Sequence, residues 1–173
     1  MIDCPFCGAE NIPGIDDCEE CGQPLSHVQN TAPENEIERS LIKDRVSALS
    51  PKQPCVVSPT ATVGEVLHEM ATNRIGCVMI VDDGKPVGIF SERDALMKLN
   101  TEAASFGDRP ISEFMTANPE TLEDSAKIAF AVQRMDLGGY RHLPIVSKDD
   151  QLQGIISVRS ILNYLTERMP TSG

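Results

Sequence analysis

The chain has 173 residues, of which 40% are hydrophobic and 24% charged, and its formal net charge is -11. This composition is typical of a globular protein that builds a core, with room for one ordinary domain or two small ones. None of its apolar runs approaches the length of roughly 20 residues that a membrane span needs. Its first residues, MIDCPFCGAE, lack a signal-peptide pattern. We therefore expect a cytoplasmic protein without a membrane partner.

The acidic charge is concentrated at the N-terminus. No Lys or Arg occurs from Met1 to Glu38, whereas this segment holds nine acidic residues. The remaining 135 residues are nearly neutral, with 15 basic and 17 acidic side chains. A negative N-terminal segment is unsuited to binding a phosphate backbone.

Two Cys-x-x-Cys pairs, each followed by Gly, lie in CPFCGAENIPGIDDCEECG. Their four thiols, Cys4, Cys7, Cys18 and Cys21, match the ligand spacing of a tetrahedral Cys4 zinc shell. About 25 residues bury too little apolar surface to fold alone, so the metal would supply most of the folding free energy. Two disulfides or a redox-active pair are the alternatives, less expected without a secretory signal. Cys55 and Cys77 lie in apolar surroundings and are interpreted as buried small hydrophobes.

Residues 4 to 25 resemble the short zinc ribbons that are fused to other domains. We assign residues 1–25 to this ribbon and residues 26–35, SHVQNTAPEN, to a linker, because they show no apolar periodicity. Ribbons often bind nucleic acid or protein. Four thiolates on a divalent ion leave a formal charge of minus two, and Asp16 and Asp17 add to it, so a protein contact or a structural role is expected instead of nucleic acid.

The rest of the chain contains one pattern twice. Pro59 matches Pro119, Met70 matches Met135, and Gly88 matches Gly154. Each copy predicts a short extended segment, a helix, two strands joined by a turn, and a second helix. In the first copy, Thr62 and Glu65 form a capping box before an apolar helical stripe of Val63, Val66, Leu67 and Met70, and CVMIV and VGIF flank the turn residues DDGK.

This tandem β-α-β-β-α pattern, with GIFSERD at the end of the first copy, resembles a pair of CBS domains, the Bateman module. The resemblance covers about residues 40 to 168 and implies an α+β fold in which two repeats pack around a pseudo-twofold axis. We assign residues 36–105 to a lead-in helix, IERSLIKDRVSAL, with the first repeat, and residues 106–169 to the second. The family binds adenosine-containing ligands between its repeats.

The resemblance also implies where a ligand would bind. In the family, Ser/Thr-x-x-Asp at the start of each second helix contacts the ribose. The first repeat matches with Ser91 and Asp94, but the second has Ser157 and Ser160, without the carboxylate. Asp94 could instead be an ordinary acid near a helix N-terminus.

Basic residues before the Pro of the second-repeat strand and near the last helix meet the ligand phosphates in the family. Here these are Arg141, His142 and Arg159, whereas the first repeat has Gly76 and Cys77 at the first two positions. Arg93 could also reach phosphate, since Arg offers a planar fork to phosphate oxygens. A solvent-exposed pair at a strand start is the alternative for Arg141 and His142. The expected adenine slot is lined by Val57, Thr60, Thr62, Ile75, Leu143 and Pro144.

These observations predict a regulatory or sensory module that binds AMP, ADP, ATP or S-adenosylmethionine in one cleft per chain and signals to a partner. The second hypothesis is an adaptor that docks through the ribbon, with the CBS pair as a dimerisation scaffold. A homodimer is expected in either case. The sequence contains no P-loop and no nucleophile and base arrangement, so no enzyme is expected.

Overall fold

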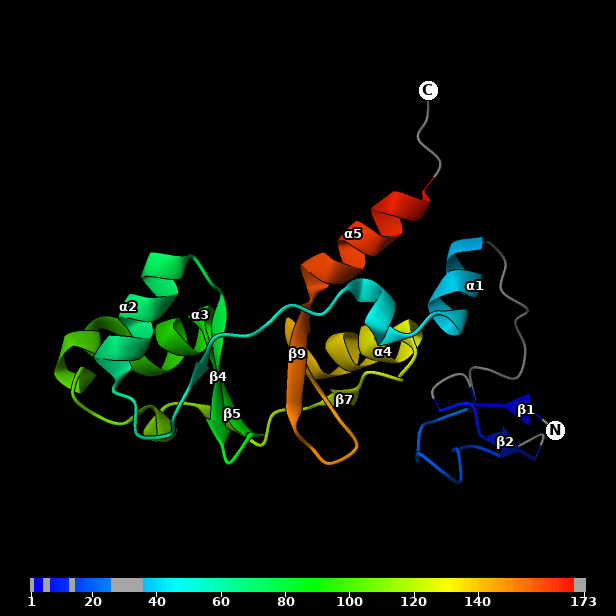
Figure 1. The fold of residues 1–173 in the computed structure, drawn as a ribbon, viewed down its shortest axis with the longest axis horizontal. Coiled ribbons are helices and arrows are strands. Elements are labelled where there is room, and N and C mark those ends of the chain that lie inside the picture. Colours follow the sequence, from blue (N-terminus) through cyan, green and yellow to red (C-terminus); the bar gives the residue numbers. More distant parts are fainter. Residues whose placement is uncertain (1, 5–6, 13–14, 26–35, 170–173) are drawn as a thin grey trace. The chain divides into compact units, whose positions relative to one another are not determined.

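The computed structural model describes residues 2–4, 7–12, 15–25 and 36–169 (Figure 1). The predicted linker, residues 26–35, lies outside the described residues. By its internal contacts the chain divides into two compact units. Unit 1 comprises residues 1–51, 122–143 and 156–173, and unit 2 comprises residues 52–121 and 144–155. Each unit therefore takes segments from both copies of the repeat.

The N-terminal segment forms a small hairpin. Strands β1 (Ile2–Asp3) and β2 (Glu10–Asn11) pair antiparallel (Figure 1). Each cysteine pair bends tightly, because the Gly8 amide donates to the Cys4 carbonyl and the Gly22 amide to the Cys18 carbonyl, both at 2.8 Å. Gly8 and Gly22 have φ of 80° and 65°, which is why glycine follows each pair.

Unit 2 is built on a four-stranded sheet in the order β3-β4-β5-β6. Strand β4 runs parallel to β3 and antiparallel to β5, and β6 pairs antiparallel with β5. The β4-β5 turn has positive φ at Asp83 and Gly84, as a tight hairpin requires. The predicted strands are thus confirmed. The bounds are β3 (Val56–Val57), β4 (Cys77–Asp82), β5 (Lys85–Ser91) and β6 (Thr116–Ala117).

Helix α2 (Val63–Asn73) supplies one side of the unit 2 core. The predicted capping box is confirmed, with Thr62 Oγ1 accepting from the Glu65 amide and the Glu65 carboxylate accepting from the Thr62 amide. The apolar stripe of α2 packs on side chains of the sheet, and Phe90 is fully buried among them. The remaining helical segments of this unit are α3 (Glu92–Asp94), a π-helical turn (Ala95–Leu99), and 3-10 turns at Asn100–Phe106 and Ile111–Glu113.

The tip of a later hairpin completes unit 2. Backbone amides and carbonyls of Lys52 and Ile155 exchange hydrogen bonds of 3.0 and 2.9 Å, and the Leu152 amide donates to the Gly84 carbonyl at 3.1 Å. This hairpin belongs to the three-stranded sheet β7-β8-β9. The bounds are β7 (Leu122–Glu123), β8 (His142–Val146) and β9 (Leu152–Ser157).

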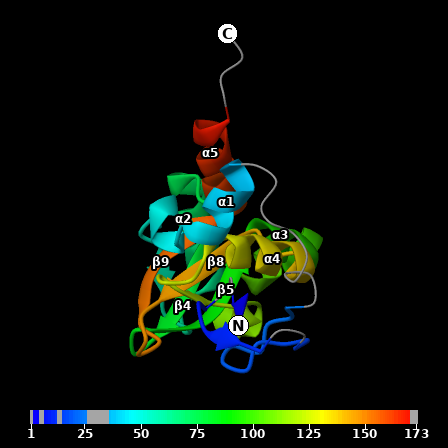
Figure 2. The same ribbon diagram turned by 90° about the vertical axis from the view of Figure 1, so that its right-hand side faces the viewer.

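The helices of unit 1 pack around α4 (Ile128–Gly138). This helix contacts α1 (Glu36–Lys43), the 3-10 turn Val46–Leu49, and α5 (Val158–Arg168). Figures 1 and 2 show α4 below α1 and α5 in both views. Ile128, Ala131 and Met135 of α4 are buried in this packing.

The lead-in helix ends earlier than the sequence pattern indicates. Its α-helical part stops at Lys43, and Arg45 is extended, with φ of -93° and ψ of 159°. Tertiary hydrogen bonds cause the break: the Asp44 carbonyl accepts from the Ile128 amide at 3.0 Å, and the Val46 amide donates to the Ala126 carbonyl at 2.8 Å. These tertiary contacts outweigh the helix propensity of the residues that follow Lys43.

Within the described ranges, no helix combines the length and apolar character needed to cross a membrane.

Candidate functional site

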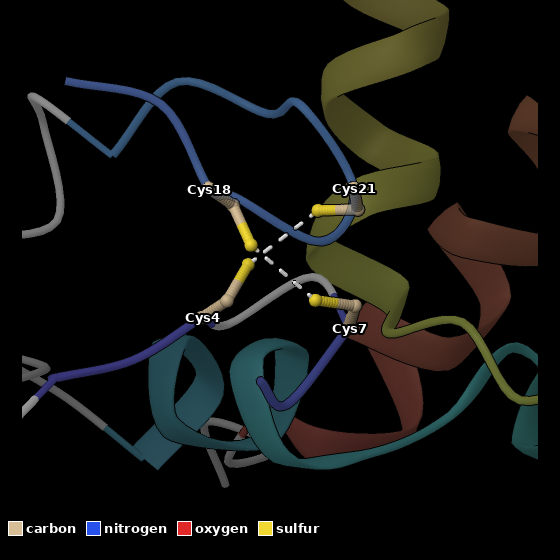
Figure 3. A group of neighbouring side chains, drawn as sticks. All are labelled: Cys4, Cys7, Cys18 and Cys21. Atoms are coloured by element: carbon tan, nitrogen blue, oxygen red, sulfur yellow. Dashed lines mark hydrogen bonds between the residues drawn. The ribbon is translucent and has the colours of Figure 1, made fainter. Parts of the chain in front are cut away.

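The four cysteines of the N-terminal segment converge on one point. Their Sγ atoms all lie within 4.8 Å of one another, and they point toward a common centre from two turns (Figure 3). The Cys4–Cys21 and Cys7–Cys18 sulfur pairs are 3.7 and 3.6 Å apart. A tetrahedron with Zn–S bonds of about 2.3 Å has edges of about 3.8 Å. The donor set and its spacing therefore fit a tetrahedral thiolate-bound ion.

The environment of Cys18 favours its thiolate. Burial disfavours the charged form, but N–H groups of Cys21, Glu20 and the Asn11 side chain outweigh burial and lower the pKa of Cys18 to about 6. Burial raises the pKa of Cys7 and of Cys21. Because metal binding requires thiolates, Cys18 loses its proton at a lower cost than Cys7 or Cys21.

Cys55 and Cys77 behave differently from these four. Both are half-buried. Burial raises the pKa of Cys77 to about 12 and, together with the Glu69 charge, raises the pKa of Cys55. Their thiols stay protonated at neutral pH, which suits packing and not nucleophilic chemistry.

The predicted ribose-binding pair, Ser91 and Asp94, is preorganised at the start of α3. Ser91 caps the helix in extended conformation, and its amide and Oγ donate to Asp94 Oδ2 at 2.9 and 2.6 Å. The other carboxylate oxygen, Oδ1, accepts from Thr116 Oγ1 at 2.9 Å and pairs with Lys98 Nζ at 2.8 Å. Thr116 and Lys98 were not identified from the sequence, because no motif links them to Asp94.

This network keeps the Asp94 carboxylate ionised. Partial burial alone would raise its pKa, but hydrogen bonds from Lys98, Ser91 and Thr116 lower it. Lys98 Nζ also donates to the Phe114 carbonyl at 2.9 Å and to Thr116 Oγ1 at 3.0 Å, so the ammonium is fully hydrogen-bonded. The negative charge and its orientation are therefore fixed at neutral pH.

The equivalent turn of the second repeat has the same shape with different chemistry. Ser157 caps α5 in extended conformation, and its amide donates to Ser160 Oγ at 3.1 Å. A hydroxyl thus takes the place of the Asp94 carboxylate and closes the capping box without a charge. Strand and helix are joined in the same way in both repeats. The Glu92 amide donates to the Gly76 carbonyl, and the Val158 amide donates to the Arg141 carbonyl, each at 3.0 Å.

The predicted phosphate-binding residues lie around that second turn. Arg141 and Arg159 are exposed, and His142, at the start of β8, is partly exposed. The Val158 amide donates to the Arg141 carbonyl, so the backbone of Arg141 lies close to the backbone that carries Arg159 in unit 1. Asp94 and Ser91 belong to unit 2, so the meeting of the two groups in one cleft stays a prediction.

The remaining predicted residues are distributed over both units. Val57 and Ile75 are partly buried and pack against the unit 2 core, Thr62 caps α2, and Thr60 and Arg93 are exposed. Thr60 Oγ1 lies 2.9 Å from Ser58 Oγ. Leu143 and Pro144 of β8 are buried, and the boundary between the two units falls between them. Their common role as an adenine slot stays a prediction.

The repeat architecture and the paired capping turns define a two-repeat regulatory module. The CBS domain model matches residues 46–101 and 111–167, and the chain belongs to the CBS domain family, as a CBS pair. The α+β fold expected for such a pair is confirmed.

Several known proteins are similar to part of this chain. An uncharacterised 17.7 kDa protein of Acidianus ambivalens is 28% identical over 124 residues, which are 71% of this chain and 74% of that one. Protein MK0525 of Methanopyrus kandleri is 33% identical over 106 residues, or 61% of this chain and 54% of that one. The match to an inosine-5'-monophosphate dehydrogenase of Methanocaldococcus jannaschii, at 31% identity, spans only 21% of that enzyme.

Solved structures share the fold of the CBS pair. Protein PAE2072 of Pyrobaculum aerophilum, complexed with AMP, is 30% identical with a TM-score of 0.61, and the match covers 72% of this chain and 99% of that one. ATU1752 of Agrobacterium tumefaciens is 26% identical with a TM-score of 0.64, covering 70% and 98%.

Proposed function

We propose that this CBS pair is a sensory module that binds one adenine nucleotide, AMP, ADP or ATP, and passes the bound state to a protein partner. The ribose hydroxyls bind the Asp94 carboxylate, and the phosphates bind Arg141, His142 and Arg159. The observation that carries the proposal is the chemical difference between two equivalent turns: Asp94 is an ionised carboxylate, whereas Ser160 is a neutral hydroxyl. One ribose site per chain follows.

Two further observations support this ligand class. PAE2072, with 30% identity over nearly its whole length, was solved with AMP bound. The basic side chains gather at the turn that lacks the carboxylate, in a chain of net charge -11. The ribose of an adenine nucleotide carries two neighbouring hydroxyls and, at its 5' carbon, an anionic phosphate, so the ligand matches a site with a carboxylate on one side and basic groups on the other. Val57, Thr60, Thr62, Ile75, Leu143 and Pro144 remain the proposed adenine slot.

Titration calorimetry with AMP, ATP and S-adenosylmethionine tests the proposal. Asp94→Asn keeps the shape of the carboxyl group but removes the charge that accepts two ribose hydroxyls, so we expect about tenfold to 100-fold weaker nucleotide binding. Asp150→Asn is the matched control, since Asp150 is an exposed acid that lies 3.8 Å from Lys85 Nζ. Equal binding by wild type and Asp94→Asn, or no binding to either, contradicts the proposal.

We also propose that Cys4, Cys7, Cys18 and Cys21 bind one structural Zn²⁺. The sulfur spacing supports a tetrahedral thiolate site, and a shell closed by four cysteines leaves no open position for catalysis. The bound ion would supply the folding free energy that so short a segment lacks. The ion thus stabilises the fold of the ribbon, and the surface of the ribbon can contact a protein partner.

The second candidate function is an adaptor whose CBS pair serves mainly for homodimerisation. Exposed apolar side chains favour it: Leu96 and Met97, next to Asp94, are each 75% exposed. Such side chains are typical of a surface covered by a second copy. The nucleotide content of purified protein separates the functions, because a deproteinised extract that absorbs near 260 nm supports sensing and an extract without nucleotide supports the adaptor.

A further inference from the structure

Asn11 is the one polar residue that is buried among the described residues, with 2% of its surface exposed. It lies at the end of β2, between the two cysteine pairs. A buried amide without partners destabilises a fold, and a segment this small has little apolar packing to offset that cost. Its position therefore requires specific partners.

The side chain of Asn11 has three partners. Nδ2 donates to the Ala9 carbonyl at 2.8 Å and to Cys18 Sγ at 3.5 Å, and Oδ1 accepts from the Glu19 amide at 3.1 Å. The Ala9 carbonyl can only accept and the Glu19 amide can only donate, so these two contacts fix which end of the Asn11 amide faces the sulfur. An N–H group, and not an oxygen, points at Cys18.

The charge of the segment explains why such a donor is needed. Four thiolates on a divalent ion carry a formal charge of minus two, and no Lys or Arg occurs between Met1 and Glu38. Within this segment, compensation has to come from amide N–H groups. Backbone amides supply part of it, and Asn11 adds a side chain whose direction is fixed at both ends.

We propose that Asn11 is a positioning residue of the metal centre: its Nδ2–H group stabilises the Cys18 thiolate and fixes the direction of its sulfur. This inference rests on the metal site proposed above. Hydrogen bonds to metal ligands typically change metal affinity by about tenfold to 100-fold. We expect a loss of this size when the donor is removed.

Two substitutions in the full chain separate a donor role from a merely structural one. Asn11→Leu removes all three hydrogen bonds while keeping a side chain that branches at Cγ. Asn11→Asp keeps the oxygen that accepts from Glu19 but turns a second oxygen toward Cys18 and Ala9. If Asn11 acts only through the Glu19 contact, Asp would restore binding relative to Leu. The donor role predicts the opposite order, with Asp weaker than Leu. Asn73→Leu, which removes an Asn73–Glu69 contact in α2, is the matched control.

Zn²⁺ affinity is measured by competition with a chromophoric chelator, and Co²⁺ substitution provides a spectroscopic readout. We expect Asn11→Leu to weaken Zn²⁺ binding by about tenfold to 100-fold and to shift the sulfur-to-cobalt charge-transfer band to lower energy, because a thiolate without its donor is easier to oxidise. Asn73→Leu should change neither quantity.

The remaining outcomes are also decisive. Unchanged affinity and band position in both Asn11 variants overturn the inference but leave the metal site intact. A variant that never reaches a tetrahedral cobalt spectrum, even at saturating metal, overturns it in favour of a purely structural role. Wild-type protein that binds neither ion overturns the metal proposal and this inference together.

Discussion

Lys98 Nζ lies 2.8 Å from Asp94 Oδ1, one helical turn along the chain from the carboxylate proposed to hold a ribose. With Ser91 N, Ser91 Oγ and Thr116 Oγ1, the carboxylate accepts from four donors, about as many as its lone pairs allow. Ser91 belongs to the capping box, whereas Lys98 and Thr116 share the other oxygen. A ligand diol therefore has to displace Lys98 and Thr116 from Oδ1.

Replacing Lys98 by Met should strengthen the binding of adenosine by about threefold to fivefold, since one competing donor is lost. Adenosine is the appropriate probe because it has no phosphate whose attraction to Lys98 would hide the effect. Thr116→Val should act in the same direction without a change of charge. Lys85→Met is the control, and the measurement is titration calorimetry. Unchanged or weaker adenosine binding by both variants would show that Lys98 and Thr116 do not compete with the ribose.

Tyr164→Phe should lower the free energy of unfolding by about 1–2 kcal/mol, because the buried Tyr164 hydroxyl donates to Asp44 Oδ2 at 2.6 Å. Urea unfolding followed by circular dichroism measures it. Tyr140, which is 40% exposed, provides the control variant Tyr140→Phe, for which a change near zero is expected. Equal stabilities of the two variants would contradict a role for the Tyr164–Asp44 bond.

Stability should also depend on alkaline pH through Tyr164. Burial, followed by the hydrogen bond and charge of Asp44, raises the pKa of Tyr164 to about 12, compared with about 10 in an unfolded chain. Because the folded value is the higher one, this contribution is fully present below about pH 10 and is lost as pH rises through 12. Absorbance titration should show a tyrosinate step near pH 12 that is missing in Tyr164→Phe. A Tyr164 that ionises near pH 10 in folded protein would refute this.

Native mass spectrometry should find one zinc ion per chain, and Cys18→Ser should lose it, since a neutral hydroxyl cannot replace a thiolate ligand. Cys55→Ser is the matched control and should retain the ion. Removal of zinc by a chelator should leave the thermal transition of the CBS pair in place while the ribbon thiols become reactive. Zinc retained by Cys18→Ser, or a metal-free wild type, would argue against the Cys4 site.

Paired substitution of Leu96 and Met97 by Ser should convert a dimer to a monomer in light scattering without loss of stability, because both side chains are exposed within the chain. Ile12→Ser, at a position that is 63% exposed in the ribbon, is the control and should remain dimeric. A wild-type monomer, or a dimer unaffected by the paired change, would rule out this face as the interface.

Elements governed by local chemistry were predictable from sequence. The Thr62–Glu65 box and the α2 stripe depend on residues within two turns of one another, and the two β-rich runs on either side of DDGK predicted β4 and β5. The helix break at Arg45 was not predictable, because its cause is backbone hydrogen bonding to residues about 80 positions away. The π-helical turn at Ala95–Leu99 also has no sequence signal that we can identify.

The candidate sites divide in the same way. Spacing alone predicted the four thiols, and the Ser/Thr-x-x-Asp motif of the CBS resemblance indicated Ser91 with Asp94, which the structure joins in a capping box. Thr116 and Asn11 act through contacts that depend on the fold: Thr116 of strand β6 reaches Asp94 of helix α3, and Asn11 occupies a position where a polar residue usually indicates an exposed loop. The joining of Asp94 with Arg141, His142 and Arg159 in one cleft remains a prediction.

The division of the chain into units has a consequence for any attempt to split it. The polypeptide passes from one unit to the other between Pro51 and Lys52, after Thr121, after Leu143 and after Ile155. A cut between the two repeats, within residues 102–110, would leave both units incomplete, since the N-terminal fragment would lack residues 122–143 and 156–173 of unit 1 and residues 111–121 and 144–155 of unit 2. The two halves of the gene should therefore yield soluble protein only when expressed together, as complementary fragments. Evolutionary loss of either repeat would remove both units at once.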